Sequence, residues 1–143
     1  TQLWPLARAR AVIAETVANC DLFLPSLEDA ELFTGLAGCE AVMDWCLRAG
    51  APVVVLKLGK GGVLLGTPHE RTLVPGHAVD VVDATGAGDC FAGALLARLV
   101  AGDTSQEAVR YANAAAALTT TGFGAVAPIP RPDAVRRFLQ ARD

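Results

Sequence analysis

The apolar positions of the chain repeat with a helical period in some segments and form short β-branched runs in others. The helical pattern predicts helices over residues 6–18, 26–35, 39–50, 88–101, 105–118 and 133–141. The β-branched and apolar runs predict short strands over residues 21–25, 52–59, 63–67, 71–75 and 78–82. Because helices and strands alternate early in the chain, we expect an α/β layered domain with a largely parallel sheet.

Local signals set several of the expected boundaries. Ser26 has the position of an N-cap, with Asp29 three residues later as in a capping box, and a glycine ends that helix. The run at 52–59 is almost wholly apolar, which is typical of a central strand, and residues 60–62 predict a tight turn into a hairpin partner. Since no repeat or linker is visible, residues 1–143 are expected to form one domain.

The composition excludes several classes of partner. The 143 residues are 52% hydrophobic and carry a formal net charge of −3 without a cluster of Lys or Arg, so neither nucleic acid nor an anionic membrane is an expected partner. No apolar run reaches the length of a membrane span. The four cysteines form no CxxC pair and have no histidine at zinc-ligand spacing, which predicts free thiols in a reducing cytoplasm.

The segment DATGAGD, residues 83–89, carries the strongest chemical signal. Gly86, Ala87 and Gly88 leave the backbone uncovered, and the helix that follows has unpaired N–H groups in its first turn. These N–H groups and the helix dipole favour a bound anion, so we call residues 86–88 the anion cradle and expect phosphate there. The chain has neither the GxxxxGK[ST] pattern of P-loop proteins nor a GxGxxG pattern after a strand.

Asp89 places a carboxylate beside the anion cradle. A carboxylate would repel a resting phosphate, but it suits a site where a hydroxyl loses its proton as a phosphoryl group arrives. In that interpretation the cradle stabilises the transferred group, while Asp89 orients and deprotonates the nucleophile. The alternative is that Asp89 is an acidic first-turn residue favoured by the helix dipole alone.

The segment DATGAGDCFAGA, residues 83–94, resembles the C-terminal signature D-T-x-G-A-G-D-x-F of the ribokinase-like (PfkB) carbohydrate kinases. Ala84 stands where the family usually has Thr, which removes a hydroxyl but no cradle atom. Residues 56–65 and 111–118 resemble the family's nucleotide-side hairpin and adenine-side helix. The resemblance implies a ribokinase-like three-layer α/β/α fold, of which the chain is the C-terminal, nucleotide-binding and catalytic part without the N-terminal half and lid.

The resemblance also implies the roles of individual residues. Asp89 would be the catalytic base and would contact the acceptor substrate, with Gly86, Ala87 and Gly88 as the cradle of the transferred group. ATP, accompanied by Mg²⁺, is expected against Lys57, Gly59, Lys60, Gly62 and Asn113. The alternatives are solvated turn lysines, plain turn glycines and, for Asn113, a residue on a helix surface.

Two metal sites follow from the same resemblance. Asp83 and Thr85 match positions that bind a monovalent cation in some relatives, so K⁺ is a candidate ligand together with carbonyls of residues 119–128. The alternative for Asp83 is a hydrogen-bond acceptor that staples the loop. Ser26 and Asp29 stand where many relatives have an N-x-x-E motif that organises magnesium, and the capping box explains both residues equally well.

The expected reaction is transfer of the ATP γ-phosphate to a sugar or sugar-acid hydroxyl. Residues 25–35 and 119–130 look most like 2-keto-3-deoxygluconate kinases, whose product is the 6-phosphate. The alternatives are a fructose, ribose or nucleoside kinase, or a catalytically weak nucleotide-binding fragment. Since the sugar contacts and dimer-forming lid belong to the family's N-terminal half, we expect a fragment of a homo-oligomeric parent, weakly active alone.

The two histidines and two tryptophans are expected to have structural rather than catalytic roles. His69 and His77 have no partners at catalytic spacing and are expected on the surface. Trp4 and Trp45 are expected to be core or interface aromatics.

Overall fold

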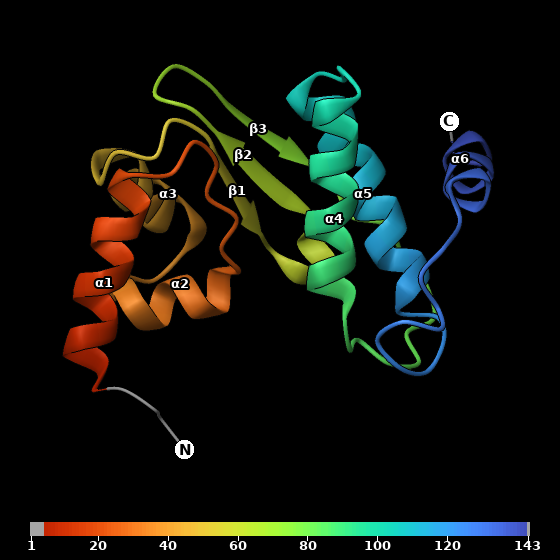
Figure 1. The fold of residues 1–143 in the computed structure, drawn as a ribbon, viewed down its shortest axis with the longest axis horizontal. Coiled ribbons are helices and arrows are strands. Elements are labelled where there is room, and N and C mark those ends of the chain that lie inside the picture. Colours follow the sequence, from red (N-terminus) through yellow and green to blue (C-terminus); the bar gives the residue numbers. More distant parts are fainter. Residues whose placement is uncertain (1–4, 143) are drawn as a thin grey trace. The chain divides into compact units, whose positions relative to one another are not determined.

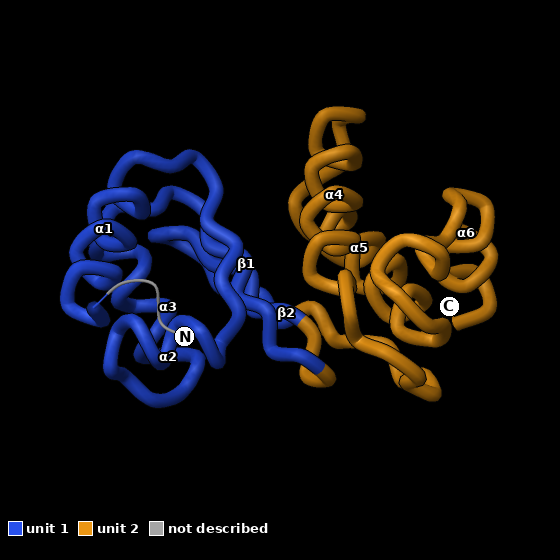
Figure 2. Tube along the Cα trace, turned by 60° about the horizontal axis from the view of Figure 1, so that its bottom comes forward, with its two compact units in different colours: residues 1–59, 63–73 blue, residues 60–62, 74–143 orange. Residues whose placement is uncertain are grey.

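The computed structural model describes residues 5–142, and the chain divides into two compact units (Figure 2). Unit 1 comprises the chain up to Gly59 together with Val63–Leu73. Unit 2 comprises Lys60–Gly62 and the chain from Val74 onward. That residues 1–143 form one domain stays a prediction.

Unit 1 is built on a small sheet whose strand order is β1-β2-β3. β1 (Val54–Lys57) and β2 (Val63–Gly66) are antiparallel, and β3 (Arg71–Val74) follows. The short 3-10 helix η1 (Gly59–Gly61) connects the first two strands, as expected of a tight turn in a hairpin. The first three residues of β1 are buried, as its apolar run predicts, but β1 is the end strand of this three-stranded order rather than a central strand.

The helices α1 (Leu6–Ala18), α2 (Leu27–Thr34) and α3 (Cys39–Arg48) gather on one side of this sheet (Figure 1). Trp45 packs edge-on against Phe33 at 5.6 Å, which confirms it as a core aromatic, whereas Trp4 lies outside the described residues. The helices and the sheet enclose a core of mostly large apolar side chains: Val17, Ala30, Val42, Met43, Cys46, Ala51, Val54, Leu56 and Leu64.

Sequence signals explain how the unit 1 helices start and stop. The Ser26 hydroxyl accepts a hydrogen bond from the Asp29 backbone N–H at 3.2 Å, which confirms the predicted N-cap of α2. Gly35 ends that helix in the left-handed region with φ 74°, as predicted. Arg71 donates to the carboxylates of Glu40 and Asp44 on α3, so β3 is tied to that helix and the pKa of Asp44 is lowered.

Unit 2 is helical. α4 (Ala87–Val100) and α5 (Ser105–Thr119) form a hairpin, seen side by side in Figures 1 and 2, and α6 (Pro132–Gln140) packs against α5. The connection between α4 and α5 is fixed by Arg98, which donates to both carboxylate oxygens of Asp103 at 2.6 Å. Because α5 is buried through alanines at 108, 112, 114 and 115, the helices can pack closely.

The predicted largely parallel sheet is wrong for the described residues. The named strands β1 and β2 run antiparallel, because the turn between them is too short for a parallel crossover. The predicted strand at 21–25 has one isolated parallel bridge, from Phe23 to Val54, and a second bridge joins Ser26, just after it, to Lys57. Parallel pairing therefore contributes only at the outer edge of β1.

The predicted strand at 78–82 is also wrong. Its backbone is irregular, and the N–H groups of Val82 and Asp83 both donate to the carbonyl of Thr120 rather than to a strand. Val81 and Val82 are exposed, so the β-branched run does not bury a sheet face here.

Within the described part of the chain, no helix is both long and apolar enough to span a bilayer.

Candidate active site

The loop before α4 is held in place by Asp83. One oxygen of its carboxylate accepts hydrogen bonds from the Thr85 backbone N–H at 2.9 Å and the Thr85 hydroxyl at 2.7 Å. The other oxygen accepts from the backbone N–H of Gly124 at 2.9 Å. These hydrogen bonds stabilise the ionised carboxylate and lower the pKa of Asp83, with the Thr85 hydroxyl as the main cause. Asp83 thus joins the loop before α4 to the loop after α5.

Gly86 makes the turn into α4. It is the N-cap residue, with φ 77° in the left-handed region. A Cβ atom added to it would lie 2.8 Å from the carbonyl oxygen of Ala125, so only glycine fits between the two loops. The anion cradle is therefore fixed both by its own glycine and by the loop after α5.

The first turn of α4 presents the N–H groups expected of an anion site. The N–H of Ala87 donates to Ala84 at 3.2 Å, whereas those of Gly88 and Asp89 have no backbone acceptor in the described chain. Such N–H groups point out of a helix N-terminus, where the helix dipole also favours negative charge. Asp89 is exposed at the third position of the same helix. The structure thus brings a solvent-facing carboxylate and two free backbone donors into one turn.

Two further predicted site residues, Gly62 and Asn113, both contact residues 74–75. Gly62 is buried with φ 91°, and an added Cβ atom would lie 2.2 Å from the carbonyl oxygen of Val74. Asn113 on α5 donates through Nδ2 to the carbonyl oxygens of Val74 at 3.4 Å and Pro75 at 3.2 Å. Asn113 is buried, so the alternative of a helix surface residue is excluded.

The sequence of residues 1–132 matches the pfkB family of carbohydrate kinases. This match contains the whole loop before α4, the turn at 60–62 and Asn113. The chain belongs to the pfkB carbohydrate kinase family. The family assignment agrees with the resemblance seen in the segment at 83–94.

Known members of the PfkB family match nearly all of the chain. A 2-dehydro-3-deoxygluconokinase of Bacillus subtilis is 34% identical over 142 residues, which are 98% of this chain and 44% of that protein. The chain therefore spans less than half the length of this relative.

Two solved structures show the fold. A ribokinase II from E. coli in complex with ATP and Mg²⁺, itself described as putative, superposes with a TM-score of 0.86 at 29% identity over 95% of this chain and 44% of that one. A fructokinase double mutant from Vibrio cholerae, bound to fructose, ADP and potassium, gives 0.86 at 34% identity over 93% and 45%. The chain thus has a ribokinase-like α/β fold that covers about half of these structures.

The predicted PfkB site residues fall in both units. Lys57 and Gly59 belong to unit 1, where Lys57 ends β1 and donates its backbone N–H to Pro25 at 2.9 Å. Lys60 is exposed in η1 and belongs to unit 2 with Gly62, Asn113, the anion cradle and Asp89. Unit 2 by itself therefore holds the base candidate, the cradle and part of the predicted ATP contacts.

The oxygen atoms around Asp83 fit a monovalent cation. The Asp83 carboxylate and the Thr85 hydroxyl are hard donors, and the loop after α5 lies against them through Gly124. The alternative role of Asp83, a hydrogen-bond acceptor that holds the loop, is present in the structure, and the K⁺ site stays a prediction. By contrast, the Ser26 hydroxyl donates to Asp29 at 2.5 Å within the helix cap. Among residues 5–142, no group of three or more acidic, histidine or cysteine side chains is arranged to hold a metal ion.

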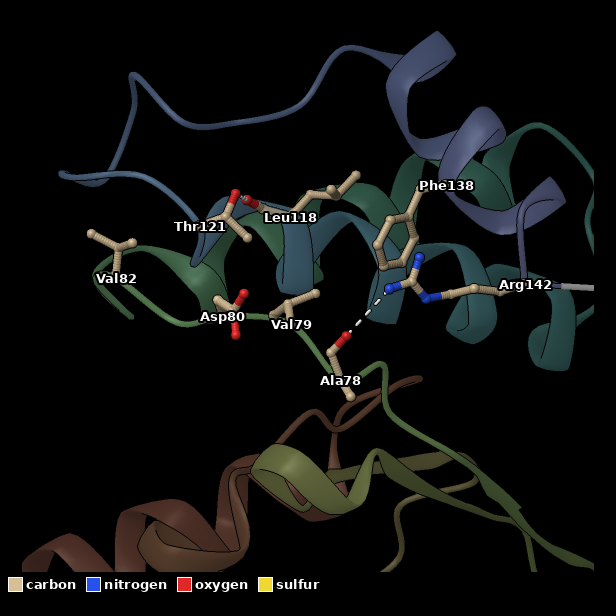
Figure 3. A pocket seen from close by; sticks show the side chains of 8 residues that line it. All are labelled: Ala78, Val79, Asp80, Val82, Leu118, Thr121, Phe138 and Arg142. Carbon is tan, nitrogen blue, oxygen red and sulfur yellow. Dashed lines mark hydrogen bonds between the residues drawn. The ribbon is translucent and has the colours of Figure 1, made fainter.

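An open groove of about 590 Å³ also lies in unit 2, and of the predicted site it includes only Thr121, from the 119–128 segment (Figure 3). The Arg142 guanidinium lies 3.9 Å above the Phe138 ring and donates to the carbonyl of Ala78 at 3.3 Å, as the dashed line in Figure 3 shows. The lining residues are Ala78, Val79, Asp80, Val82, Leu118, Thr121, Phe138 and Arg142.

His77, next to this groove, differs from its predicted surface position. Its ring is half-buried edge-on against Phe138 at 5.2 Å, and its Nε2 atom is buried without a hydrogen-bond partner in the described chain. Burial and the nearby positive charges of Arg142 and Arg110 lower the pKa of His77. His69 is exposed, as predicted.

From the family resemblance, the sequence analysis expected residues 119–128 beside Asp83 and Thr85 as K⁺ ligands, but it missed the contacts that this segment makes with the loop before α4 and the segment that packs on Gly62. Thr120, Gly124 and Ala125 fix the loop before α4, and the segment 74–76 packs on Gly62. The Pro75-Gly76 pair is a turn signal, but nothing in its composition indicates which part of the chain it contacts.

Proposed function

We propose that the chain is the nucleotide-binding and catalytic part of an ATP-dependent kinase that phosphorylates a sugar hydroxyl. One observation carries the proposal: the Asp89 carboxylate shares the first turn of α4 with the uncommitted N–H groups of Gly88 and Asp89. This is the arrangement needed when an anionic group and a hydroxyl must meet at one place. Membership of the pfkB family supports it independently.

In the proposed reaction Asp89 accepts the proton of the acceptor hydroxyl. The hydroxyl oxygen forms a bond to the γ-phosphorus of ATP as the bond from that phosphorus to the β–γ bridging oxygen breaks, and ADP leaves. The backbone N–H groups of the cradle hold the phosphoryl oxygens, and the Asp83 staple keeps those N–H groups in place. Mg²⁺ that accompanies ATP would neutralise phosphate charge.

The remaining ATP contacts are proposed for residues near the turn between β1 and β2. Lys57 and Lys60 would supply positive charge to the phosphates, and Gly59 and Gly62 would allow close approach of the backbone. K⁺ would bind Asp83 and Thr85 and order the cradle. The complexes with ATP and Mg²⁺ and with ADP and potassium, described for the two structural relatives, support both proposals.

The preferred acceptor is 2-keto-3-deoxygluconate, giving its 6-phosphate. The 34% identity to the Bacillus subtilis 2-dehydro-3-deoxygluconokinase supports it. The similarity to a fructokinase at the same identity keeps fructose, and ribokinase-type sugars, as the alternative. The four free cysteines suit a reducing cytoplasm, where we place the reaction, and we propose a homo-oligomeric whole protein.

The test is release of ADP by the full-length protein with 2-keto-3-deoxygluconate, fructose and ribose in parallel, with Mg²⁺, with and without K⁺. Release dominated by the keto-deoxy acid supports the preferred acceptor. Release with a neutral sugar instead keeps the kinase and replaces the acceptor. ATP binding without turnover on any sugar would contradict the kinase proposal and favour the nucleotide-binding fragment.

A further inference from the structure

Asn113 is a buried amide that is hydrogen-bonded to protein backbone. The residue is only 9% exposed, and its Nδ2 atom donates to the carbonyl oxygens of Val74 at 3.4 Å and Pro75 at 3.2 Å. These hydrogen bonds connect α5 to the segment 74–76 and give the buried amide nitrogen its partners.

The segment that Asn113 holds lies directly on the turn at 60–62. A Cβ atom on Gly62 would be 2.4 Å from the Gly76 nitrogen, and one on Gly76 would be 2.8 Å from the Lys60 carbonyl oxygen. The two backbones therefore touch without a side chain between them. Any displacement of the segment 74–76 is passed to the turn, because close-packed backbone cannot absorb it.

We propose that Asn113 is a positioning residue for the turn at 60–62, acting through the segment 74–76 rather than by contact with the nucleotide. The proposal rests on the proposed role of that turn in binding ATP phosphates. The family resemblance implies that Asn113 contacts the nucleotide directly. In this proposal Asn113 instead holds the segment 74–76, and that segment holds the turn at 60–62. It also explains why a polar side chain occupies a buried position on an alanine-rich helix.

Asn113→Asp is the most informative variant, because it exchanges the donating nitrogen for an oxygen that two carbonyls repel. Asn113→Ala and Asn113→Ser provide smaller disturbances if the first variant folds poorly. Asn19→Asp is the matched control: Asn19 is exposed, and its Nδ2 donates to Glu15 at 2.8 Å. The same change of charge there should leave unit 2 unaffected.

The first measurement is amide hydrogen exchange without nucleotide. In Asn113→Asp the exchange rate of the buried Gly62 amide should rise by about tenfold or more, as expected when the hydrogen bonds that hold the segment 74–76 are lost. Exchange in the unit 1 core should stay unchanged. An unchanged rate at Gly62 would overturn the inference even if the variant binds nucleotide poorly.

The second measurement is binding of MgATP, MgGTP and magnesium triphosphate to the wild-type chain and the variants. The dissociation constant should rise by a similar factor for all three, on the order of tenfold, because the supported turn is proposed to contact phosphates. A loss confined to MgATP would instead indicate direct contact with the base and overturn the inference.

The pH profile separates positioning from packing. Between about pH 8 and about pH 5, protonation of the carboxyl in Asn113→Asp restores a donor, so its binding should recover relative to wild type. Asn113→Ala should show no such recovery, and recovery in both variants or in neither would contradict the role of the donor. If the wild-type chain binds none of the three ligands, the proposed nucleotide site fails, whereas the exchange measurement still decides the role of Asn113.

Discussion

Units 1 and 2 are stabilised by different means. Unit 1 packs helices against a sheet through large apolar side chains such as Met43, Val54 and Leu56. Unit 2 has no named strand apart from the last residue of β3, and its central helix is buried through alanines. Its loops depend on side chains that bond to backbone, above all Asp83 and Asn113. The predicted base Asp89 and the predicted anion cradle lie in unit 2, whose loops are held by these specific hydrogen bonds.

This difference has a physical reason. A core of large side chains gains free energy from burial and tolerates many sequences. A phosphate site needs exposed backbone N–H groups, which large side chains would cover. Where the backbone itself is to be the binding surface, small residues and side-chain-to-backbone hydrogen bonds must therefore hold the loops in place of a large apolar core.

The strongest test of the comparison is Asp89→Asn in unit 2. Turnover of the full-length protein should fall by about a thousandfold, as when a general base is removed, while the melting temperature changes little because Asp89 is exposed. A kinase assay and a thermal melt measure the two effects. Asp80→Asn is the matched control, since Asp80 is also an exposed aspartate of unit 2. Near-wild-type turnover in Asp89→Asn would exclude Asp89 as the base.

Met43→Ala should have the opposite profile in unit 1. Met43 is fully buried and lies against Gly66, where a Cβ atom would be 2.3 Å from its sulfur. The cavity should reduce the free energy of unfolding by about 2–5 kcal/mol.

In unit 2, Ala114→Leu should instead reduce the free energy of unfolding by overpacking, by about 1–3 kcal/mol. Denaturant titration measures both, and a neutral Ala114→Leu would mean that the alanine-lined helix packing is loose.

A pair of glycine variants separates backbone conformation from close contact in unit 2. Gly62 and Gly102 have similar φ values of 91° and 96°, but only Gly62 is in backbone contact where a Cβ would form. Gly102→Ala should cost about 1 kcal/mol through conformation alone, and Gly62→Ala about 2 kcal/mol more. Equal losses in denaturant titrations would show that the segment 74–76 can move aside freely.

The smallest expected effect is a pH dependence at His77. Its pKa is lowered from 6.5 in the folded protein, so the unfolded chain binds the proton more readily. Stability should therefore fall as pH drops below about 6.5, because burial, and then the positive charges of Arg142 and Arg110, disfavour the charged ring. His77→Phe should flatten the melting temperature between about pH 7.5 and about pH 5.5, whereas the exposed His69→Phe should not. Identical profiles for both variants would contradict this.

The sequence predicted elements well where a local signal existed. The six helices were expected within a few residues of their bounds, because caps such as Ser26 and Gly35 are short-range features. The hairpin of β1 and β2 was also expected, and Gly59 and Gly62 at its turn have positive φ values. That residues 86–88 bind an anion stays a prediction.

What failed depends on distant parts of the chain. Residues 78–82 have a strand-like pattern, but their backbone pairs with Thr120, which no local signal indicates. The same holds for the engagement of Asn113 with Val74 and for the burial of His77 beside Phe138. Sheet direction failed for a related reason: apolar runs indicate strands but do not specify their partners.

The hydrogen bond from Gly124 to Asp83 spans 41 residues and encloses the entire α4–α5 hairpin. A chain synthesised from its N-terminus exposes the anion cradle long before Gly124 has emerged from the ribosome. Until then the loop lacks its distant anchor, and closing so long a loop carries an entropy cost that only the finished hairpin offsets. The proposed phosphate site is thus completed late in synthesis, and we expect a nascent chain that ends before Gly124 to have the signature sequence without this hydrogen bond.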